Sequence, residues 1–268
     1  MYPHTIDIGK SLGKGGFGVV SFGTRRDTGD QLAVKQINPI WNADAETIAS
    51  MRDTIESECE ASERLHHKNI VTYFGFKMEA NDFLRGQMIY EYCELDLSKE
   101  IYPEGLAQIT IQSYAIQLID AIEYMHSSGW VHRDIKPGNI LLSPRRDHSV
   151  LKLADLGSAL LLDEETIVDR PKAEIGNCHG RLIVGKSNFF LGQFGENDYD
   201  IEKWRNPLEH YEQKKGKLET LFGGSAFILY AKNFINRCFD HNPETRITAS
   251  ELKNHAFLGQ IVTSYSWY

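Results

Sequence analysis

Four side chains in the middle of the chain have the types and the spacing that phosphate chemistry requires. Asp134, Lys136 and Asn139 lie within six positions, and Asp155 follows in an Ala-Asp-Leu-Gly motif after a short apolar run and a charged turn. Carboxylate and amide oxygens are hard ligands that suit Mg²⁺, which shares the phosphate oxygens of a bound nucleotide. Phosphoryl transfer depends on positioning and on neutralising charge, so a few groups of this kind can support it.

Either acid alone would be an ordinary carboxylate in a surface turn. Together they flank a pattern of strand, turn and strand, with apolar runs at residues 140–142 and 150–153. With this arrangement, the alternative that the two acids lie in unrelated surface turns is remote. We therefore interpret the two acids as parts of one site.

A glycine cluster near the start of the chain has the pattern GxGxxG, formed by Gly13, Gly15 and Gly18. A dinucleotide-binding turn has the same pattern but opens a helix with it. Here the apolar run that starts at Val19 continues as a strand, so the glycines form the bend of a hairpin. Without Cβ atoms such a bend can close over phosphates and donate backbone N–H groups. Taken alone, the motif fits a plain flexible hairpin tip equally well.

Lys35 lies inside an apolar strand, in the run Leu-Ala-Val-Lys that follows the glycine cluster. Burying its ammonium would be costly unless the charge is paired. The natural partners are phosphate oxygens and a carboxylate from the helix that follows, where Glu56, Glu58 and Glu60 are candidates. The alternative is a lysine whose end snorkels to the surface.

The elements that must position these groups divide the chain into a strand-rich front and a helical back. Period-two alternation and turn residues predict strands over residues 5–12, 19–25, 31–38, 72–78 and 87–92. The polar stretch from about 44 to 65 predicts one mostly exposed helix.

Beyond the strands, six apolar residues from Ile111 to Met125 lie at helical spacing, and Gly129 is a suitable stop. Phe227, Tyr230, Phe234, Ile235 and Cys238 form another apolar face. The run from Thr248 to Glu251 is a capping box that opens a final short helix.

Composition limits the classes of function. The 268 residues are 41% hydrophobic and 25% charged, which is ordinary for a globular protein, and the formal net charge of -8 argues against nucleic-acid binding. No apolar run approaches the ~20 residues that span a bilayer. Cys59, Cys93, Cys178 and Cys238 lack CxxC spacing, which favours reduced thiols in a cytoplasmic protein. Cys178 with its neighbouring histidine lacks a second pair that would complete a metal site.

The motifs in this order resemble the protein kinase superfamily. The resemblance runs from about Ile6 to Leu162 and resumes from about Ala231 to Leu258. The Lys-Pro form of the catalytic loop is similar to Ser/Thr kinases rather than tyrosine kinases, and the whole is most similar to MAP kinase kinase kinases. The resemblance implies an α+β bilobal fold in a single domain, 1–268. A small antiparallel sheet lobe with one helix would span 1–92 and a larger, mainly helical lobe 93–268, with the hinge near 91–96.

The resemblance also implies roles in binding ATP and Mg²⁺. Asp134 would orient the acceptor hydroxyl or take its proton, and Lys136 would neutralise the transferring group. Asn139 and Asp155 would ligate Mg²⁺.

Further roles implied by the resemblance concern the nucleotide itself. Lys35 would anchor the phosphates, and its distance from the His-Lys-Asn-Ile-Val segment favours Glu58 as its partner. Tyr90 would be the gatekeeper, while Glu91 and Cys93 would offer backbone groups to adenine. The residues expected to enclose the adenine ring are Leu12, Val20, Ala33 and Leu141.

Between about 162 and 231 the chain departs from the family pattern. The Ala-Pro-Glu motif and the following Asp-x-Trp-x-x-Gly motif have no match, and Asp198 and Asp200 are the candidates to replace that aspartate. Arg246, which would pair with the missing glutamate, is expected either to be exposed or to meet another acid such as Glu196 or Glu202.

Three interpretations of this segment stay open: a divergent but working substrate platform, a pseudokinase, or foreign sequence from a mistaken exon join. Arg133 would form a charge-assisted pair with a phosphorylated residue, for which Thr166 and Ser187 are the candidates. Ser62 also departs, because the family packs an apolar residue at that position.

The leading hypothesis is a Ser/Thr protein kinase that transfers the γ-phosphate of ATP to a protein hydroxyl in a signalling cascade, with a downstream kinase as a candidate substrate. The alternative is a nucleotide-binding pseudokinase or scaffold with impaired peptide binding. A kinase acting on small molecules is a third interpretation, which Lys136 fits less well. Nothing in the sequence indicates an oligomeric state.

Overall fold

The computed structural model describes ten stretches of the chain, and the account below concerns them alone. They are residues 2–15, 18–37, 44–79, 82–100, 108–143, 150–162, 230–231, 233–234, 237–238 and 245–259. The chain forms two compact units. Unit 1 comprises Met1–Glu94 and Leu142–Ala159, and unit 2 comprises Leu95–Leu141 and Leu160–Tyr268.

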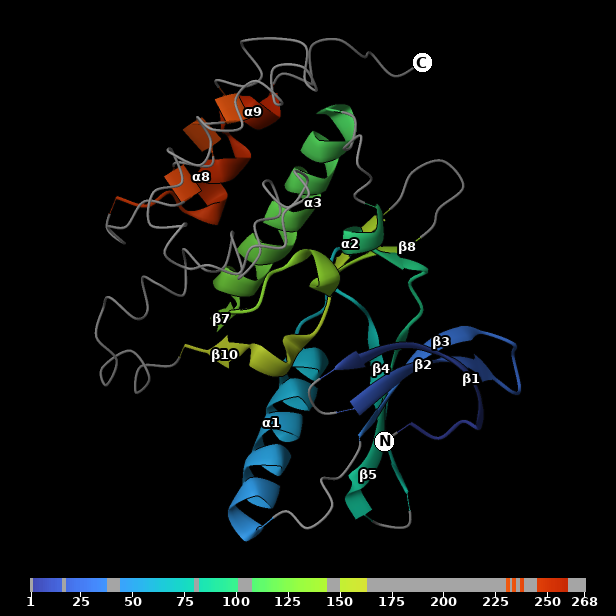
Figure 1. Ribbon diagram of the computed structural model, residues 1–268. Coiled ribbons are helices and arrows are strands. Elements are labelled where there is room, and N and C mark those ends of the chain that lie inside the picture. Colours follow the sequence, from blue (N-terminus) through green and yellow to red (C-terminus); the bar gives the residue numbers. More distant parts are fainter. Residues whose placement is uncertain are drawn as a thin grey trace. The chain divides into compact units, whose positions relative to one another are not determined.

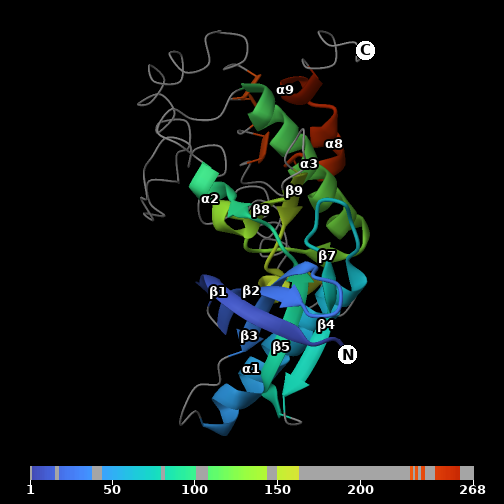
Figure 2. The same cartoon turned by 90° about the vertical axis from the view of Figure 1, so that its right-hand side faces the viewer.

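Unit 1 is built on a five-stranded antiparallel sheet in the order β1-β2-β3-β5-β4 (Figure 2). Its strands are β1 (Ile6–Gly15), β2 (Gly18–Arg25), β3 (Gln31–Ile37), β4 (Tyr73–Glu79) and β5 (Asp82–Glu91). All five predicted strands are confirmed. Two of them are longer than predicted, because hairpin partners extend the pairing: β1 continues until Gly15 faces Gly18, and β5 starts at Asp82, which faces Glu79.

The predicted exposed helix is α1 (Ala45–Arg64), which packs against β4 and β5. The Asp44 side chain caps it by accepting a hydrogen bond from the Thr47 backbone N–H at 2.8 Å. Such a cap satisfies one of the backbone donors that a helix start leaves open. Its buried residues form one narrow stripe, consisting of Met51, Ile55, Glu58, Ala61 and Ser62.

The segment between α1 and β4 ties strand β9 (Val150–Leu153) to unit 1. Ile70 pairs in parallel with Leu153, and the Leu153 N–H donates to the Asn69 carbonyl at 2.8 Å. The buried Asn69 amide also donates to the Leu151 carbonyl at 2.8 Å. These bonds explain why Leu142–Ala159 groups with the sheet unit, although the resemblance placed all of residues 93–268 in the second lobe. The break after Glu94 falls within the segment 91–96 that we expected to be the hinge.

Unit 2 is helical around α3 (Gln108–Ser127), with α8 (Ala249–Lys253) and α9 (Ala256–Gly259) beside it (Figure 1). The predicted apolar face of α3 is buried at all six positions. The Gln112 amide donates to the Phe257 carbonyl at 2.6 Å, which fastens α9 to α3. The other elements are β6 (Leu95–Asp96), α2 (Leu97–Glu100), β7 (Trp130–Val131), β8 (Ile140–Ser143, which crosses the boundary between the units) and β10 (Leu160–Leu161).

The predicted helix boundaries in unit 2 are confirmed. Gly129 follows α3 with a φ of 79°, in the left-handed region that glycine adopts without strain. Thr248 and Glu251 form the capping box in both directions and open α8, but a second short helix, α9, follows it. Phe234 and Cys238 are buried as expected, whereas Phe227 and Ile235 lie outside the described residues. Across the parts of the chain that the structure describes, no helix combines the length and apolarity needed to cross a membrane.

Candidate active site

Lys35 on β3 and Glu58 on α1 form a close ion pair inside unit 1. The Lys35 Nζ atom lies 2.6 Å from Glu58 Oε1 and 2.7 Å from Oε2, and the two side chains are only 13% and 3% exposed. Glu58 is thus the partner among the three acids that the sequence offered. Burial by itself would lower the pKa of Lys35, but the negative charges of Glu58 and Asp155 outweigh it and raise that pKa. The lysine is therefore a buried cation and not a snorkelling surface residue.

Asp155 joins this pair from the segment after β9. Its Oδ1 atom lies 3.3 Å from Lys35 Nζ, and its side chain is 46% exposed. Its φ of 63° places it in the left-handed region, which non-glycine residues adopt at a cost and which is enriched at functional sites. One ammonium thus holds two carboxylates, one buried and one open to solvent.

Gly157 lies at a tightly packed corner beside the ion pair. A Cβ atom there would lie 3.0 Å from Glu58 Oε2. The short 3-10 helix Leu156–Ser158 packs against α1 at this point. The glycine after the aspartate therefore lets the Asp155 segment approach the ion pair.

The catalytic-loop residues come together in unit 2. Asp134 Oδ2 accepts hydrogen bonds from Lys136 Nζ at 2.6 Å and from the Asn139 amide nitrogen at 3.1 Å. The same nitrogen donates to the Asp134 backbone carbonyl at 2.8 Å. Because its nitrogen is committed to Asp134, the amide oxygen of Asn139 is the atom that can ligate a cation.

Backbone contacts shape this loop. The Asp134 N–H donates to the Nδ1 atom of the fully buried His132 at 3.2 Å, so that ring nitrogen carries no proton. Arg133 has a φ of 66°, and within the described residues it and Asp155 are the only non-glycine residues at positive φ. The two strained positions thus lie in the two motifs that carry the predicted chemistry. Asp134 and Asp155 belong to different units, so their approach to one another stays a prediction.

The glycine cluster forms the bend between β1 and β2, where Gly15 pairs with Gly18 and residues 16–17 lie outside the described part. A Cβ atom at Gly18 would lie 1.9 Å from the Gln36 carbonyl oxygen. Around Gly13 no atom lies within 4 Å of such a Cβ. Sheet packing alone therefore requires the glycine at 18, whereas nothing in the described sheet requires the one at 13.

The expected adenine residues of unit 1 share one face of the sheet. Val20 lies opposite Lys35 in the β2–β3 pairing, and Ala33 is two residues before Lys35 on the same strand. Both are half-buried, as is Leu12 on β1, whereas Leu32 and Val34 on the opposite face are buried. Leu141 is half-buried too, but it belongs to unit 2.

Glu91, which we expected at the hinge, directs its side chain into the fold. Its Oε1 atom accepts hydrogen bonds from the backbone N–H and the hydroxyl of Thr72, at 2.6 and 2.8 Å, and lies 2.7 Å from Lys152 Nζ. Its own N–H donates to the Thr72 carbonyl at 2.9 Å. The carboxylate thus binds Thr72 and Lys152, and the contact of the Glu91 backbone with adenine stays a prediction. Cys93, the second expected hinge contact, is buried.

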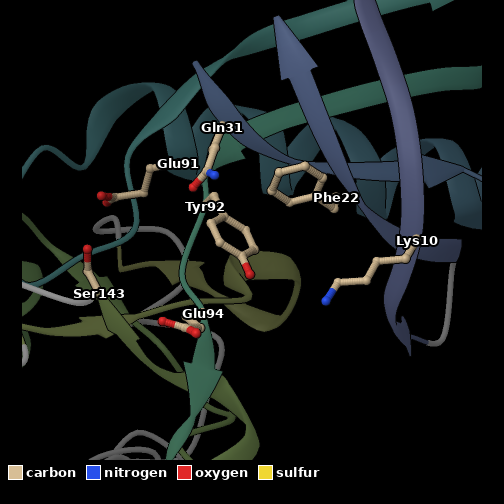
Figure 3. A pocket seen from close by; sticks show the side chains of 7 residues that line it. All are labelled: Lys10, Phe22, Gln31, Glu91, Tyr92, Glu94 and Ser143. Carbon is tan, nitrogen blue, oxygen red and sulfur yellow. The ribbon is translucent and has the colours of Figure 1, made fainter. Parts of the chain in front are cut away.

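A pocket of about 820 Å³ lies beside the hinge in unit 1 (Figure 3). Its lining consists of Lys10, Phe22, Gln31, Glu91, Tyr92, Glu94 and Ser143. The Phe22 and Tyr92 rings meet edge to face with centroids 5.0 Å apart. Of the residues predicted for adenine, Glu91 alone lines this pocket, so the pocket does not coincide with the predicted adenine site. The sequence carried one signal for it: Phe22 comes two residues after Val20, on the same face of β2.

Comparison with known proteins decides the family. The family model of the protein kinase domain matches residues 6–175. The chain belongs to the protein kinase family. The antiparallel sheet unit and the helical unit are the two parts of its α+β fold, so the predicted fold class is confirmed.

This kinase chain resembles MAP kinase kinase kinases. It is 28% identical over 276 residues to MAP kinase kinase kinase wis4 of Schizosaccharomyces pombe, an alignment covering 93% of the chain and 19% of that protein. It is 26% identical over 273 residues to human mitogen-activated protein kinase kinase kinase 4, covering 93% of the chain and 16% of that protein. Serine/threonine-protein kinase chk-2 of Caenorhabditis elegans is 36% identical over 173 residues, covering 62% of the chain and 34% of that protein. The chain spans about a third or less of each of these relatives.

The family match ends at residue 175, soon after the point where the sequence pattern departs. Thr166, Ser187, Glu196, Asp198, Asp200 and Glu202 lie outside the described residues. Arg246 is buried, so the expectation that it could be exposed is wrong. Ser62 is buried as well, at the position where the resemblance implies an apolar residue in the family.

The glycine geometry predicts different effects for two matched substitutions. Gly18→Ala should lower the free energy of unfolding by about 1–3 kcal/mol, as overpacking does, because its Cβ would collide with the Gln36 carbonyl. Gly13→Ala is the control and should stay within about 0.5 kcal/mol of the wild type. Urea unfolding of both variants measures this difference, and equal losses would contradict the assigned packing role of Gly18.

Two of the described cysteines should react slowly in the native protein. Burial and the Glu91 charge raise the pKa of Cys93 to about 12, and burial raises the pKa of Cys59 to about 11. Because the thiolate is the nucleophile, iodoacetamide at pH 8 should alkylate both at least about 100-fold more slowly than free cysteine, a factor of about ten for each unit of pKa. Peptide mass spectrometry after timed quenching gives the rates, with guanidinium-unfolded protein as the control. Native rates equal to the unfolded ones would disprove this protection.

Proposed function

We propose that this chain is a Ser/Thr protein kinase that transfers the γ-phosphate of ATP to a hydroxyl group of a protein. The observation that carries the proposal is the cluster of Lys35, Glu58 and Asp155. It presents one ammonium, held by a buried carboxylate, beside an aspartate that is open to solvent. An ammonium fixed in this way can bind phosphate oxygens without the cost of being ordered during the reaction.

Asp155 and Asn139 are the residues that would hold Mg²⁺. Their donor set fits this ion, since a solvent-exposed carboxylate oxygen and an amide oxygen are hard ligands. The bound ion would neutralise charge on the ATP phosphates.

In unit 2, Asp134 would orient the acceptor hydroxyl and take its proton. Its carboxylate accepts hydrogen bonds from Lys136 and Asn139, which hold it in one orientation. The Lys136 ammonium would turn from Asp134 toward the phosphoryl group as that group leaves ATP. The hinge backbone at Glu91 and Cys93 would bind adenine, with Leu12, Val20, Ala33 and Leu141 around the ring.

The substrate that we propose is a protein, with a downstream kinase as the first class to test, and the place is the cytoplasm. Two of the relatives are named as MAP kinase kinase kinases, which supports a protein kinase as substrate. All three cysteines that the structure describes are free thiols, as is usual in a reducing compartment. The names of the relatives favour the enzyme over a silent nucleotide-binding scaffold.

Phosphoryl transfer by purified protein tests the proposal. With Mg²⁺ and labelled ATP, the wild type should phosphorylate a generic basic protein on serine or threonine, and Asp134→Asn should lose about 10²-fold or more because the proton acceptor is gone. Phosphoamino-acid analysis identifies the residue type. Thermal stabilisation by ATP without any transfer would instead establish the scaffold.

Replacing Lys35 separates its catalytic role from its structural one. Lys35→Met should reduce turnover by about 10²–10³-fold and also destabilise the fold, because Glu58 would be left as a buried carboxylate without its cation. Adding Glu58→Gln removes that charge, so the double variant should regain stability while staying inactive. Initial rates and urea unfolding give the two readouts. Normal turnover in Lys35→Met would refute the phosphate-anchoring role.

A further inference from the structure

Tyr90, near the end of β5, is bound to the buried ion pair. Its hydroxyl donates a hydrogen bond to Glu58 Oε1 at 3.1 Å, the same oxygen that lies 2.6 Å from Lys35 Nζ. Oxygen Oε1 therefore receives two donors, one charged and one neutral. A hydrogen bond to a charged group is stronger than one between neutral groups.

The phenol is held in place by its neighbours. Tyr90 faces Ala33 across the β3–β5 pairing and Tyr73 across the β4–β5 pairing. The Tyr73 and Tyr90 rings lie 5.2 Å apart between centroids. Burial, followed by the Glu58 charge, raises the pKa of Tyr90 well above its ordinary value, so the hydroxyl keeps its proton and remains a donor.

Ser62 is part of the same environment on α1. Its buried hydroxyl lies beside the Tyr90 phenol and acts to lower the pKa of that group, although its oxygen makes no well-directed hydrogen bond within the described residues. A serine one turn after Glu58, in place of an apolar residue, leaves a polar neighbour next to the hydroxyl. The unexpected residue at 62 and the tyrosine at 90 thus occur at one spot.

Glu58 has few ways to leave this arrangement. Its two carboxylate oxygens are held by the Lys35 ammonium, and the Tyr90 hydroxyl holds Oε1 as well. Gly157 approaches so closely that a Cβ atom on it would lie only 3.0 Å from Oε2. Removing the Tyr90 hydroxyl would therefore release one of these restraints without changing any charge.

We propose that Tyr90 is a positioning residue, whose hydroxyl holds Glu58 in the place where Glu58 fixes Lys35. This inference rests on the proposed function, because that function gives Lys35 its role of anchoring phosphates. The contact of Tyr90 with Glu58 and Lys35 can nevertheless be tested without catalysis. It adds a residue from β5 to a cluster formed by β3, α1 and the segment after β9.

The test uses Tyr90→Phe, which keeps the ring and removes only the hydroxyl. Tyr73→Phe is the matched control, because it removes a hydroxyl from the adjacent ring whose contact is Cys59 Sγ at 3.6 Å and not Glu58. The first readout is the rate at which acetic anhydride acetylates Lys35 at pH 8.5, followed by peptide mass spectrometry. Lys35 should react several-fold faster in Tyr90→Phe, because a less constrained Glu58 shields its ammonium less, and at the wild-type rate in Tyr73→Phe.

The second readout is kinetic. With protein substrate and Mg²⁺–ATP, Tyr90→Phe should lose about tenfold in kcat/KM for ATP, the size expected for one hydrogen bond to a charged group. Tyr73→Phe should change it less than about twofold.

The two readouts separate the two proposals. Faster acetylation in Tyr90→Phe, together with a wild-type protein that transfers no phosphate, would keep the positioning role and refute the proposed function. Equal acetylation rates in the wild type and both variants would overturn the positioning role, whether or not the protein is an active kinase.

Discussion

The structure of unit 1 depends on one electrostatic requirement, the compensation of charges that are removed from water. An ammonium and a carboxylate with side chains 13% and 3% exposed are stable together, but either alone would be strongly unfavourable. The requirement fixes α1 against the sheet, because Glu58 must reach Lys35 from the narrow buried stripe of an otherwise exposed helix. Because few apolar residues of α1 take part in this packing, the ion pair also determines the position of the helix along its own axis relative to the sheet.

The same unit shows how a segment distant in sequence is brought to this pair. Asn69 and Ile70 pair with the end of β9 through backbone bonds, and Lys152 on that strand meets Glu91 at the hinge. β9 is thereby fixed to unit 1 by both its backbone and a side chain. Asp155 follows two residues after Leu153, the last residue of this strand. The position of the metal-binding candidate follows from a hydrogen-bonded strand, with the left-handed turn at Asp155 directing its carboxylate back to Lys35.

Local pattern was enough to predict only part of the fold and of the site. Strand alternation, the capping box at Thr248 and the glycine stop at 129 are local signals, and each is found in the structure. The requirement for a buried partner limited the choice to three acids, and only the resemblance to protein kinases favoured Glu58 among them. Local pattern could not show that Glu91 would turn its carboxylate toward Lys152, or that residues 142–159 would group with the sheet, since these contacts join segments that are far apart in the sequence.

Tyr90 illustrates a further reason why sequence alone is insufficient at this site. In the sequence it is an aromatic residue in an apolar strand, and packing would be enough to explain its half-buried ring. In the fold, removing its hydroxyl from water would cost free energy if the hydroxyl had no hydrogen-bond acceptor. Glu58 supplies an acceptor that is itself charged and buried. The two groups therefore satisfy each other: the phenol gains an acceptor, and the carboxylate gains a second donor beside Lys35. Phenylalanine at this position would fill the same space. The hydroxyl group is therefore the feature that links β5 to the chemistry of the cluster.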